Sequence, residues 1–142
     1  MTTETTAQYK YLLPLPDAET QPWWDGIKRH ELLLQRCVDC QTFRHPPQGT
    51  CTRCYSEQAE WVKTSGRGTV YTFILVYHPV LRQWQDDIPY NIVQVTPEEA
   101  PDLQIYGNMV GVENAEIRVG MPVQVVFDDV TPQHTIPRWQ PR

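Results

Sequence analysis

The sequence lacks a long hydrophobic run, because no apolar stretch approaches the roughly 18 residues that a membrane-spanning helix needs. Its first ten residues, MTTETTAQYK, also lack the basic-then-apolar pattern of a secretory signal peptide. Hydrophobic residues still make up 40% of the 142 residues, which is enough for a core. We therefore expect a cytoplasmic protein that has no membrane partner.

The common signatures of catalysis are also missing. No G-x-S-x-G, H-E-x-x-H or glycine-rich phosphate loop is present. None of the four histidines has a spaced partner, and His78 is interpreted as a loop histidine with a structural hydrogen bond. The pairs Asp86-Asp87 and Asp128-Asp129 are interpreted as solvated turns, because adjacent side chains usually diverge. We expect no catalytic residue in this chain and no catalysis by the chain alone.

Cysteine is scarce and confined to one region: the whole complement is Cys37, Cys40, Cys51 and Cys54. These residues form two C-x2-C pairs separated by ten residues. Two residues between paired cysteines let both thiolates point inward from one tight turn, and two such turns can close a tetrahedral S4 site. The set suits a structural Zn2+ and leaves no open coordination position for catalysis.

Other uses of four cysteines stay open at this point. A disulfide framework is more typical of small secreted domains, and paired C-x2-C motifs also occur as redox dithiols. Iron at the same S4 site would make the protein an electron carrier and would colour the purified material.

The N-terminal part of the chain is expected to contain a polar tail, a short helix and a strand. Residues 1–20 are polar and are interpreted as a mobile tail, or as a segment that orders against a partner. Residues 22–30 are expected to form a short helix with Pro22 at its first position. Trp23 and Trp24 either cover the metal-binding region or face a partner. Residues 32–36 are expected to form a strand that leads into the first metal turn.

After Trp61 the pattern changes to short β-branched and aromatic segments, and thirteen prolines in the chain argue against long helices. Five strands are expected, at residues 69–77, 90–96, 103–110, 123–130 and 135–139. Five strands over about eighty residues, with no convincing helix, are typical of a small closed barrel. Both faces of residues 69–77 are apolar, so this strand is either central or has one face against a partner. Trp84 and Trp139 are candidates for a contact surface.

Positive charge is in the minority, with a formal net charge of −5. Residues 59–142 hold 10 acidic and 6 basic side chains. Binding to a phosphate backbone needs a basic track, so this balance argues against a single-stranded nucleic-acid module. Tyr71, Phe73 and Tyr77 could nevertheless stack on bases.

The order of these parts resembles a family of zinc-ribbon plus OB-fold proteins that are associated with acyl-CoA enzymes. The similarity runs from about Pro22 to the end of the chain. It is carried by PWWDGIKRHELLLQRCVDC, HPP followed by CTRC, EWVKTSGRGTVYTF, IRVGMPVQVVFDDV and HTIPRW.

The resemblance implies a mainly β protein with an N-terminal tail and short helix (1–31), a rubredoxin-like zinc ribbon (32–58) and a five-stranded OB-fold barrel (59–142). It implies a non-catalytic accessory subunit of a thiolase-fold acyl-CoA enzyme, with two small subunits on a central dimer. The partner would make or break a carbon–carbon bond next to a CoA thioester, for example in the retro-aldol step of steroid side-chain breakdown. The small subunit would help to shape the acyl-CoA channel, so acyl-CoA would be a shared ligand. An accessory subunit of an acyl-CoA hydratase is the alternative.

The chain departs from the family pattern at three places. The family often has Gly after the second cysteine of each pair, where this chain has Gln41 and Tyr55. Both residues must then adopt a backbone conformation that is less favourable for them than for glycine. The family often reads FPPR where this chain has residues 45–48, HPPQ. If that arginine contacts a CoA phosphate, this chain lacks the contact, and Arg44 is near enough in sequence to substitute.

Overall fold

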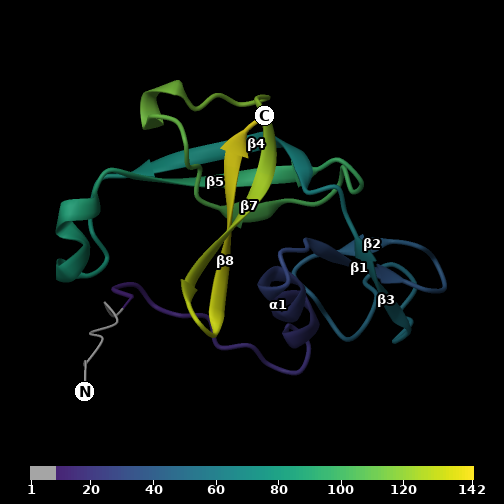
Figure 1. Ribbon diagram of the computed structural model, residues 1–142. Helices are drawn as coiled ribbons and strands as arrows, with labels where there is room; N and C mark the ends of the chain where they lie inside the picture. The colour runs from purple at the N-terminus through teal and green to yellow at the C-terminus, as the bar shows by residue number, and fades with distance from the viewer. Residues whose placement is uncertain (1–8) are drawn as a thin grey trace, which may run out of the picture.

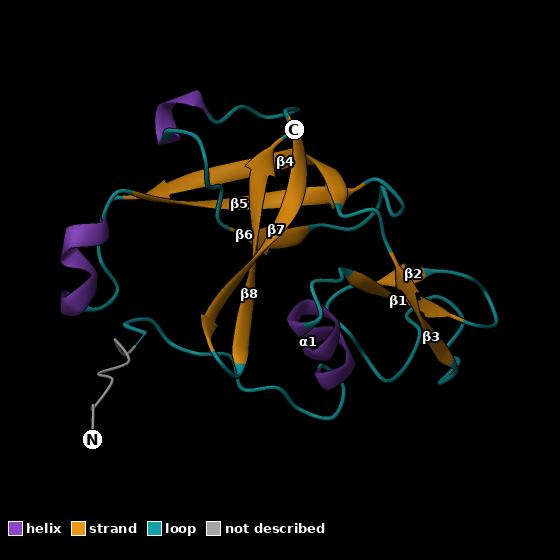
Figure 2. Ribbon diagram, in the orientation of Figure 1, coloured by secondary structure: helices purple, strands orange, loops and turns teal. Residues whose placement is uncertain are grey.

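The computed structural model describes residues 9–142, and strands dominate it (Figures 1 and 2). A three-stranded antiparallel sheet has the order β2-β1-β3, and a five-stranded antiparallel sheet has the order β6-β5-β4-β7-β8. The first sheet contains β1 (Leu33–Cys37), β2 (Phe43–Arg44) and β3 (Ala59–Lys63). The second contains β4 (Arg67–Val76), β5 (Tyr90–Pro97), β6 (Ile105–Gly107), β7 (Pro122–Thr131) and β8 (His134–Pro141). None of the helices in the described residues is long and apolar enough to cross a membrane.

The only α-helix within residues 9–142, α1 (Gln21–Lys28), confirms the expected helix and lies between the two sheets (Figure 2). Proline stands in its first turn, where a missing N–H costs nothing. Gly26 allows close packing on the three-stranded sheet, because a Cβ at this position would lie 2.8 Å from the side chain of Leu33. Trp23 and Ile27 form the buried side of the helix.

The five-stranded sheet closes into the expected barrel. The backbone N–H of Trp139 in β8 donates to Asn108 (2.9 Å), and the N–H of Val110 donates to Trp139 (2.7 Å). These bonds form a parallel bridge between Met109, just after β6, and Trp139. All five expected strands are present, although β6 is shorter than predicted. The strand with two apolar faces, β4, is central in the sheet order.

One hydrophobic core joins α1, β1 and the barrel. Trp23, Ile27 and Leu34 belong to the same buried cluster as Val125 and Trp139. The interpretation of Trp139 as a contact surface is therefore wrong, because only 1% of this residue is exposed. Trp23 is also buried, and Trp24 packs partly buried against the core, so the tryptophan pair covers the protein's own interior.

Two strands were not predicted. β2 spans only two residues and lies between the two metal turns. β3 pairs with β1 along its whole length, from Leu33 opposite Lys63 to Cys37 opposite Ala59, so the first sheet extends past the position where the barrel was expected to begin. The change of sequence pattern near Trp61 falls inside β3. The pattern indicates that a strand is present, but it does not show that this strand pairs with β1 rather than with the barrel strands. Two 3-10 helices, η1 (Arg82–Asp87) and η2 (Asn114–Glu116), also lie in the barrel connections.

Part of the segment expected to be a mobile tail packs on the barrel. Lys10 forms an ion pair with Asp87 in η1 (2.6 Å), and the rings of Tyr11 and Trp84 lie 5.7 Å apart. Residues 1–8 of the expected tail lie outside the described residues. Trp84, a candidate for a partner contact, is thus partly covered by the chain's own N-terminal segment.

Candidate metal centre and its surroundings

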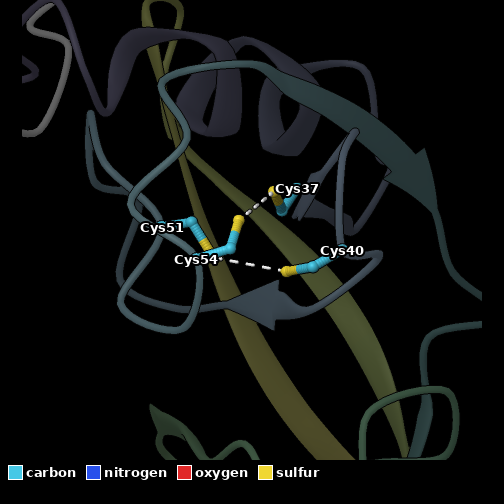
Figure 3. A group of neighbouring side chains, drawn as sticks. All are labelled: Cys37, Cys40, Cys51 and Cys54. Carbon is cyan, nitrogen blue, oxygen red and sulfur yellow. Dashed lines mark hydrogen bonds between the residues drawn. The ribbon is translucent and has the colours of Figure 1, made fainter.

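The four cysteines meet at one end of the three-stranded sheet (Figure 3). Cys37 ends β1, Cys40 lies in the following turn, and Cys51 and Cys54 lie in the second turn. The four sulfur atoms lie within 4.8 Å of one another. Sγ of Cys37 is 3.6 Å from Sγ of Cys54, and Sγ of Cys40 is 3.5 Å from Sγ of Cys51.

This geometry fits a tetrahedral metal ion. Zn–S bonds of about 2.3 Å at tetrahedral angles put the sulfur atoms about 3.8 Å apart, close to the two observed distances. A disulfide needs about 2.05 Å, so neither contact is a disulfide bond. Four protein ligands complete the coordination, so the centre is suited to a structural ion and offers no open position for a substrate.

The two metal turns have the same hydrogen-bond pattern. In the first, the N–H of Cys37 donates to Thr42 (2.9 Å), and the N–H of Gln41 donates to Cys37 (3.0 Å). In the second, the N–H of Cys51 donates to Ser56 (2.8 Å), and the N–H of Tyr55 donates to Cys51 (2.9 Å). The residue after each second cysteine is left-handed, with φ of 63° at Gln41 and 62° at Tyr55. The backbone conformation expected at these two positions is therefore present.

Hydrogen bonds to two of the four sulfur atoms favour the thiolate form that a metal requires. Bonds from the hydroxyl and the backbone of Thr42 lower the pKa of Cys40 to about 6. Bonds from the backbone of Cys54 and Arg53 lower the pKa of Cys51. The backbone of Ser56 also bonds Cys54, but burial and the neighbouring thiols of Cys37, Cys40 and Cys51 outweigh that bond and raise the pKa of Cys54 to about 12. The turns thus favour the thiolate at two of the four ligands, and a bound cation would have to displace the proton of Cys54.

Hydrogen bonds from the side chain of Arg44 hold the loop between the two metal turns. The buried Arg44 donates its Nε to Oε1 of Gln35 (2.8 Å) and to the carbonyl of Gln48 (3.0 Å). Arg44 therefore holds its own loop and is poorly placed to replace a CoA-binding arginine. The adjacent His45 packs its ring 5.5 Å from that of Trp23, and burial lowers its pKa to about 4. His45 is neutral near pH 7.

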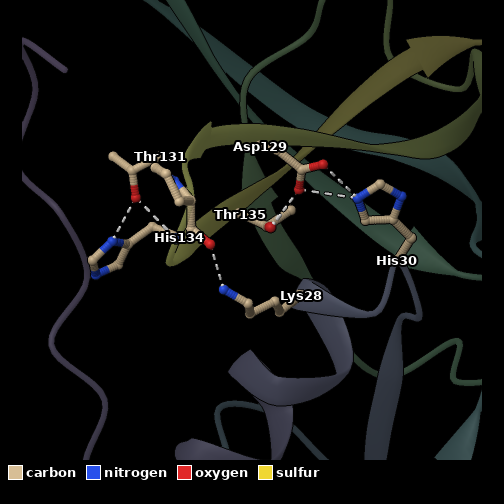
Figure 4. A network of polar contacts seen from close by, with 7 residues as sticks. Lys28, His30, Asp129, Thr131, His134 and Thr135 are labelled. Carbon is tan, nitrogen blue, oxygen red and sulfur yellow. Dashed lines mark hydrogen bonds and ion pairs between the residues drawn. The ribbon is translucent and has the colours of Figure 1, made fainter. Parts of the chain in front are cut away.

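A second polar cluster lies where α1 ends beside the hairpin of β7 and β8 (Figure 4). Nε2 of His30 is 3.0 Å from Oδ1 of Asp129, and the hydroxyl of Thr135 donates to the same oxygen (2.6 Å). Lys28 donates to the carbonyl of Pro132 in the hairpin turn (2.7 Å). No sequence pattern predicts this cluster, because 99 residues separate His30 from Asp129.

The order of contacts in this cluster does not activate a nucleophile. A nucleophilic triad needs a base bonded to the hydroxyl and an acid bonded to the base. Here the carboxylate of Asp129 bonds both the hydroxyl of Thr135 and the ring of His30. The hydrogen bonds of Thr135 and His30 lower the pKa of Asp129, so the carboxylate stays charged and acts as an acceptor. The cluster attaches α1 to the hairpin.

Other candidate residues also have structural surroundings. Asp128 and Asp129 diverge as expected, since Asp128 pairs with Arg138 (2.8 Å) on the far side of the strand from His30. Asp87 pairs with Lys10, whereas Asp86 is exposed. His78 is exposed after β4, and in the described part of the chain no hydrogen bond holds it, so the expected structural bond is not found.

A cavity of about 560 Å3 lies between the N-terminal segment and the mouth of the barrel. Trp84, Met109 and Arg138 are among the residues that line it. Arg138 is engaged, because it donates to Asp128 (2.8 Å) and to Asn108 (3.2 Å). The lining residues contain no cysteine, serine, threonine or histidine that could act as a nucleophile or as its imidazole base.

Two domains known from the protein ChsH2 match this chain. Its rubredoxin-like zinc ribbon domain matches residues 24–60, and its C-terminal OB-fold domain matches residues 61–128. A DUF35 domain-containing scaffold protein of Methanocaldococcus jannaschii is 33% identical over 120 residues, which cover 83% of this chain and 82% of that protein. The chain belongs to the DUF35 family.

Solved structures of DUF35 proteins share the fold. The structure described as the Ltp2-ChsH2(DUF35) aldolase superimposes with a TM-score of 0.80 at 31% identity, covering 90% of this chain and 98% of that chain. A DUF35 protein of unknown function from Sulfolobus solfataricus superimposes with a TM-score of 0.62 at 14% identity, covering 88% and 86%. The expected family, the zinc ribbon and the OB fold are confirmed.

Two longer relatives of this DUF35 chain are named as hydratase subunits. A probable enoyl-CoA hydratase alpha subunit of Thermomonospora curvata is 32% identical over 142 residues, or 99% of this chain. The 3-oxo-4,17-pregnadiene-20-carboxyl-CoA hydratase alpha subunit of Mycobacterium tuberculosis is 33% identical over 128 residues, or 90% of this chain. The chain spans only 43% and 39% of the length of these two proteins.

Proposed function

We propose that the chain is a non-catalytic accessory subunit of an acyl-CoA enzyme. The observation that carries this proposal is the likeness to the Ltp2-ChsH2(DUF35) aldolase, in which nearly the whole of a DUF35 chain corresponds to this one. The two relatives named as CoA hydratase subunits point to the same class of enzyme. The closed four-cysteine centre and the structural roles of Asp129 and His30 agree with a subunit that does no chemistry itself.

An exposed apolar surface on the barrel supports a protein partner. Val93 and Val95 of β5 are fully buried, so the alternate residues of β5 lie on the outer face of the sheet. Ile74 of β4 pairs with Ile92 there, and 57% of Ile74 is exposed. Tyr106 of β6 lies on the same face and is also exposed.

Tyr71 adds to this outer face, at the irregularity in pairing between Val70 and Thr72. We call Tyr71, Ile74, Ile92 and Tyr106 the outer-face patch. Ile92 is half-buried and the other three are exposed. Exposed apolar side chains gathered on one face of a sheet are typical of interaction sites. The patch agrees with the expectation that one apolar face of β4 meets a partner.

The partner in this proposal is a thiolase-fold enzyme dimer that carries two of these small subunits. It makes or breaks a carbon–carbon bond next to a CoA thioester, for example in the retro-aldol cleavage of a steroid side chain. Acyl-CoA is the shared ligand, and the small subunit stabilises the partner and helps to shape its channel. Zn2+ at Cys37, Cys40, Cys51 and Cys54 is structural, because metal binding supplies folding free energy to a short ribbon.

Hydratase association is the second candidate, since two relatives are named as hydratase alpha subunits. Nucleic-acid binding has weaker support, because acidic side chains outnumber basic ones in the barrel half.

The test is co-expression of the chain with thiolase-fold and hydratase subunits encoded beside it, followed by light scattering. We expect a stable complex with a thiolase-fold dimer and no turnover of acyl-CoA or 3-hydroxyacyl-CoA thioesters by the chain alone. Ile74→Asp should weaken the complex at least tenfold, because it places a charge in the outer-face patch. Gln133→Asp adds the same charge at the exposed β7–β8 turn and should leave affinity unchanged.

Three results would contradict the proposal. One is a chain that stays monomeric with every acyl-CoA subunit yet binds single-stranded nucleic acid with a steep salt dependence. A second is turnover by the purified chain that a point mutation in this chain abolishes. A complex formed with the hydratase subunits alone would favour the second candidate.

A further inference from the structure

Three residues with a Cβ adopt a left-handed backbone in residues 9–142. They are His30 (φ 61°), Gln41 (φ 63°) and Tyr55 (φ 62°). This conformation brings Cβ close to the backbone, so residues other than Gly adopt it at a cost. Such strain persists where another interaction holds the residue in place or where a function needs its side chain.

Interactions within the chain hold two of the three. The ring of His30 stacks on Phe127 at 5.1 Å, and its Nε2 bonds Asp129. The side-chain amide of Gln41 donates to the carbonyl of Val38 (2.8 Å), which closes the first metal turn. Both side chains therefore stabilise the conformation that strains their backbones.

Tyr55 has no such compensation. The residue is 79% exposed, and in the described chain its side chain makes neither a hydrogen bond nor an aromatic contact. Its backbone N–H makes the turn bond to Cys51, which any residue with an N–H could make. Glycine would form the same turn without strain. The fold thus gives no reason for an exposed phenol at this position.

We propose that Tyr55 is a contact residue through which the zinc ribbon binds the acyl-CoA enzyme partner; this rests on the function proposed above. The binding surface on the partner is an apolar recess with an acceptor for the phenolic O–H, because tyrosine combines a large apolar ring with one donor. This ribbon contact is separate from the outer-face patch of the barrel.

The surroundings of Tyr55 suit a rigid contact. The hydroxyl of Ser56, the next residue, bonds the carboxylate of Asp39, which ties the second metal turn to the first. Val38, beside Asp39, is 46% exposed and adds an apolar side chain to the same tied turns. A side chain presented by a cross-linked, metal-bound turn loses little conformational freedom on binding, which favours affinity.

The first measurement tests the strain itself through zinc affinity, by competition with a chelator. Tyr55→Gly should bind zinc about threefold or more tightly, because the second turn then forms without a Cβ in the left-handed region. Gln41→Gly is the matched control at the same place in the first turn. It should not gain affinity, because it loses the hydrogen bond to Val38 together with the strain.

The second measurement is the dissociation constant of the complex with the co-expressed thiolase-fold subunit. Tyr55→Gly should raise this constant about 30-fold, as expected for a central tyrosine contact. Tyr55→Phe should cause a smaller increase, because it removes only the O–H. Gln41→Gly should leave the constant unchanged.

Each outcome has a separate meaning. Tighter zinc binding together with a weaker complex in Tyr55→Gly supports the inference. A complex that tolerates Tyr55→Gly overturns the inference and leaves the accessory-subunit function standing. A wild-type chain that binds no acyl-CoA subunit overturns the proposed function and with it this contact. Unchanged zinc affinity in Tyr55→Gly would remove the strain on which the inference rests.

Discussion

The half-buried His45 is expected to make the stability of this protein depend on pH, and His45→Phe should remove this part of the dependence. The imidazole packs near Trp23, and burial holds its pKa at about 4, below the usual value of about 6.5. A base with a lowered pKa in the folded state stays neutral there while it takes up a proton in the unfolded chain. Its contribution is therefore fully present above about pH 6.5 and is lost as the pH falls toward 4.

The magnitude follows from the two pKa values. Between pH 7.5 and pH 5.5 the unfolded imidazole becomes mostly protonated, and the folded one does not. Linkage then gives a loss of about 1.3 kcal/mol in the free energy of unfolding. For a chain of this size that loss corresponds to a decrease of about 4 °C in Tm. Phenylalanine keeps the ring and its packing but cannot be protonated.

The assay is thermal unfolding of the wild type and of His45→Phe, with zinc bound, at both pH values. Protonation of the metal thiolates and of the other histidines affects both proteins equally, so the difference between the two pH-dependent losses isolates His45. We expect the variant to lose about 4 °C less than the wild type. Equal losses in the two proteins would refute the reasoning, because they would mean that His45 is accessible and titrates normally.

Two further changes test the metal centre and the barrel. Cys51→Ser should abolish zinc binding and unfold the ribbon, because metal binding supplies part of the folding free energy. Bound zinc per chain and circular dichroism measure the two effects. A variant that stays folded without metal would contradict the prediction of a structural zinc site. A chelator added to the wild type should have the same effect. Gly107→Ala should destabilise the protein by about 2 kcal/mol, because its Cβ would lie 2.8 Å from the fully buried ring of Trp139. Gly49→Ala meets only a flexible glutamate side chain and is its control, so equal melting temperatures for the two variants would show that the barrel relaxes around the clash.

Local pattern was sufficient for α1, for the five barrel strands and for the cysteine set, but not for β2 and β3. The spacing of Cys37, Cys40, Cys51 and Cys54 predicted the tetrahedral cluster, because both metal turns are local structures. Contacts between distant residues carried no such signal. His30 meets Asp129 only because α1 packs beside the β7–β8 hairpin, and Trp139 is buried because the barrel closes across it. Four tryptophans were candidates for a partner surface, but the sequence does not reveal which of their rings are buried in the core.

The core that runs from α1 into the barrel has a consequence for how the protein folds. The zinc ribbon and OB-fold domains meet near residue 60, yet Ile27 and Leu34 on one side pack in one cluster with Val125 and Trp139 on the other. Separating the halves would expose both sides of this cluster, so neither half is expected to be stable alone. The two recognised domains should therefore melt as one cooperative unit. Loss of the metal from the ribbon should then destabilise the strands that carry the outer-face patch. Zinc would in this way control whether the barrel can bind its partner.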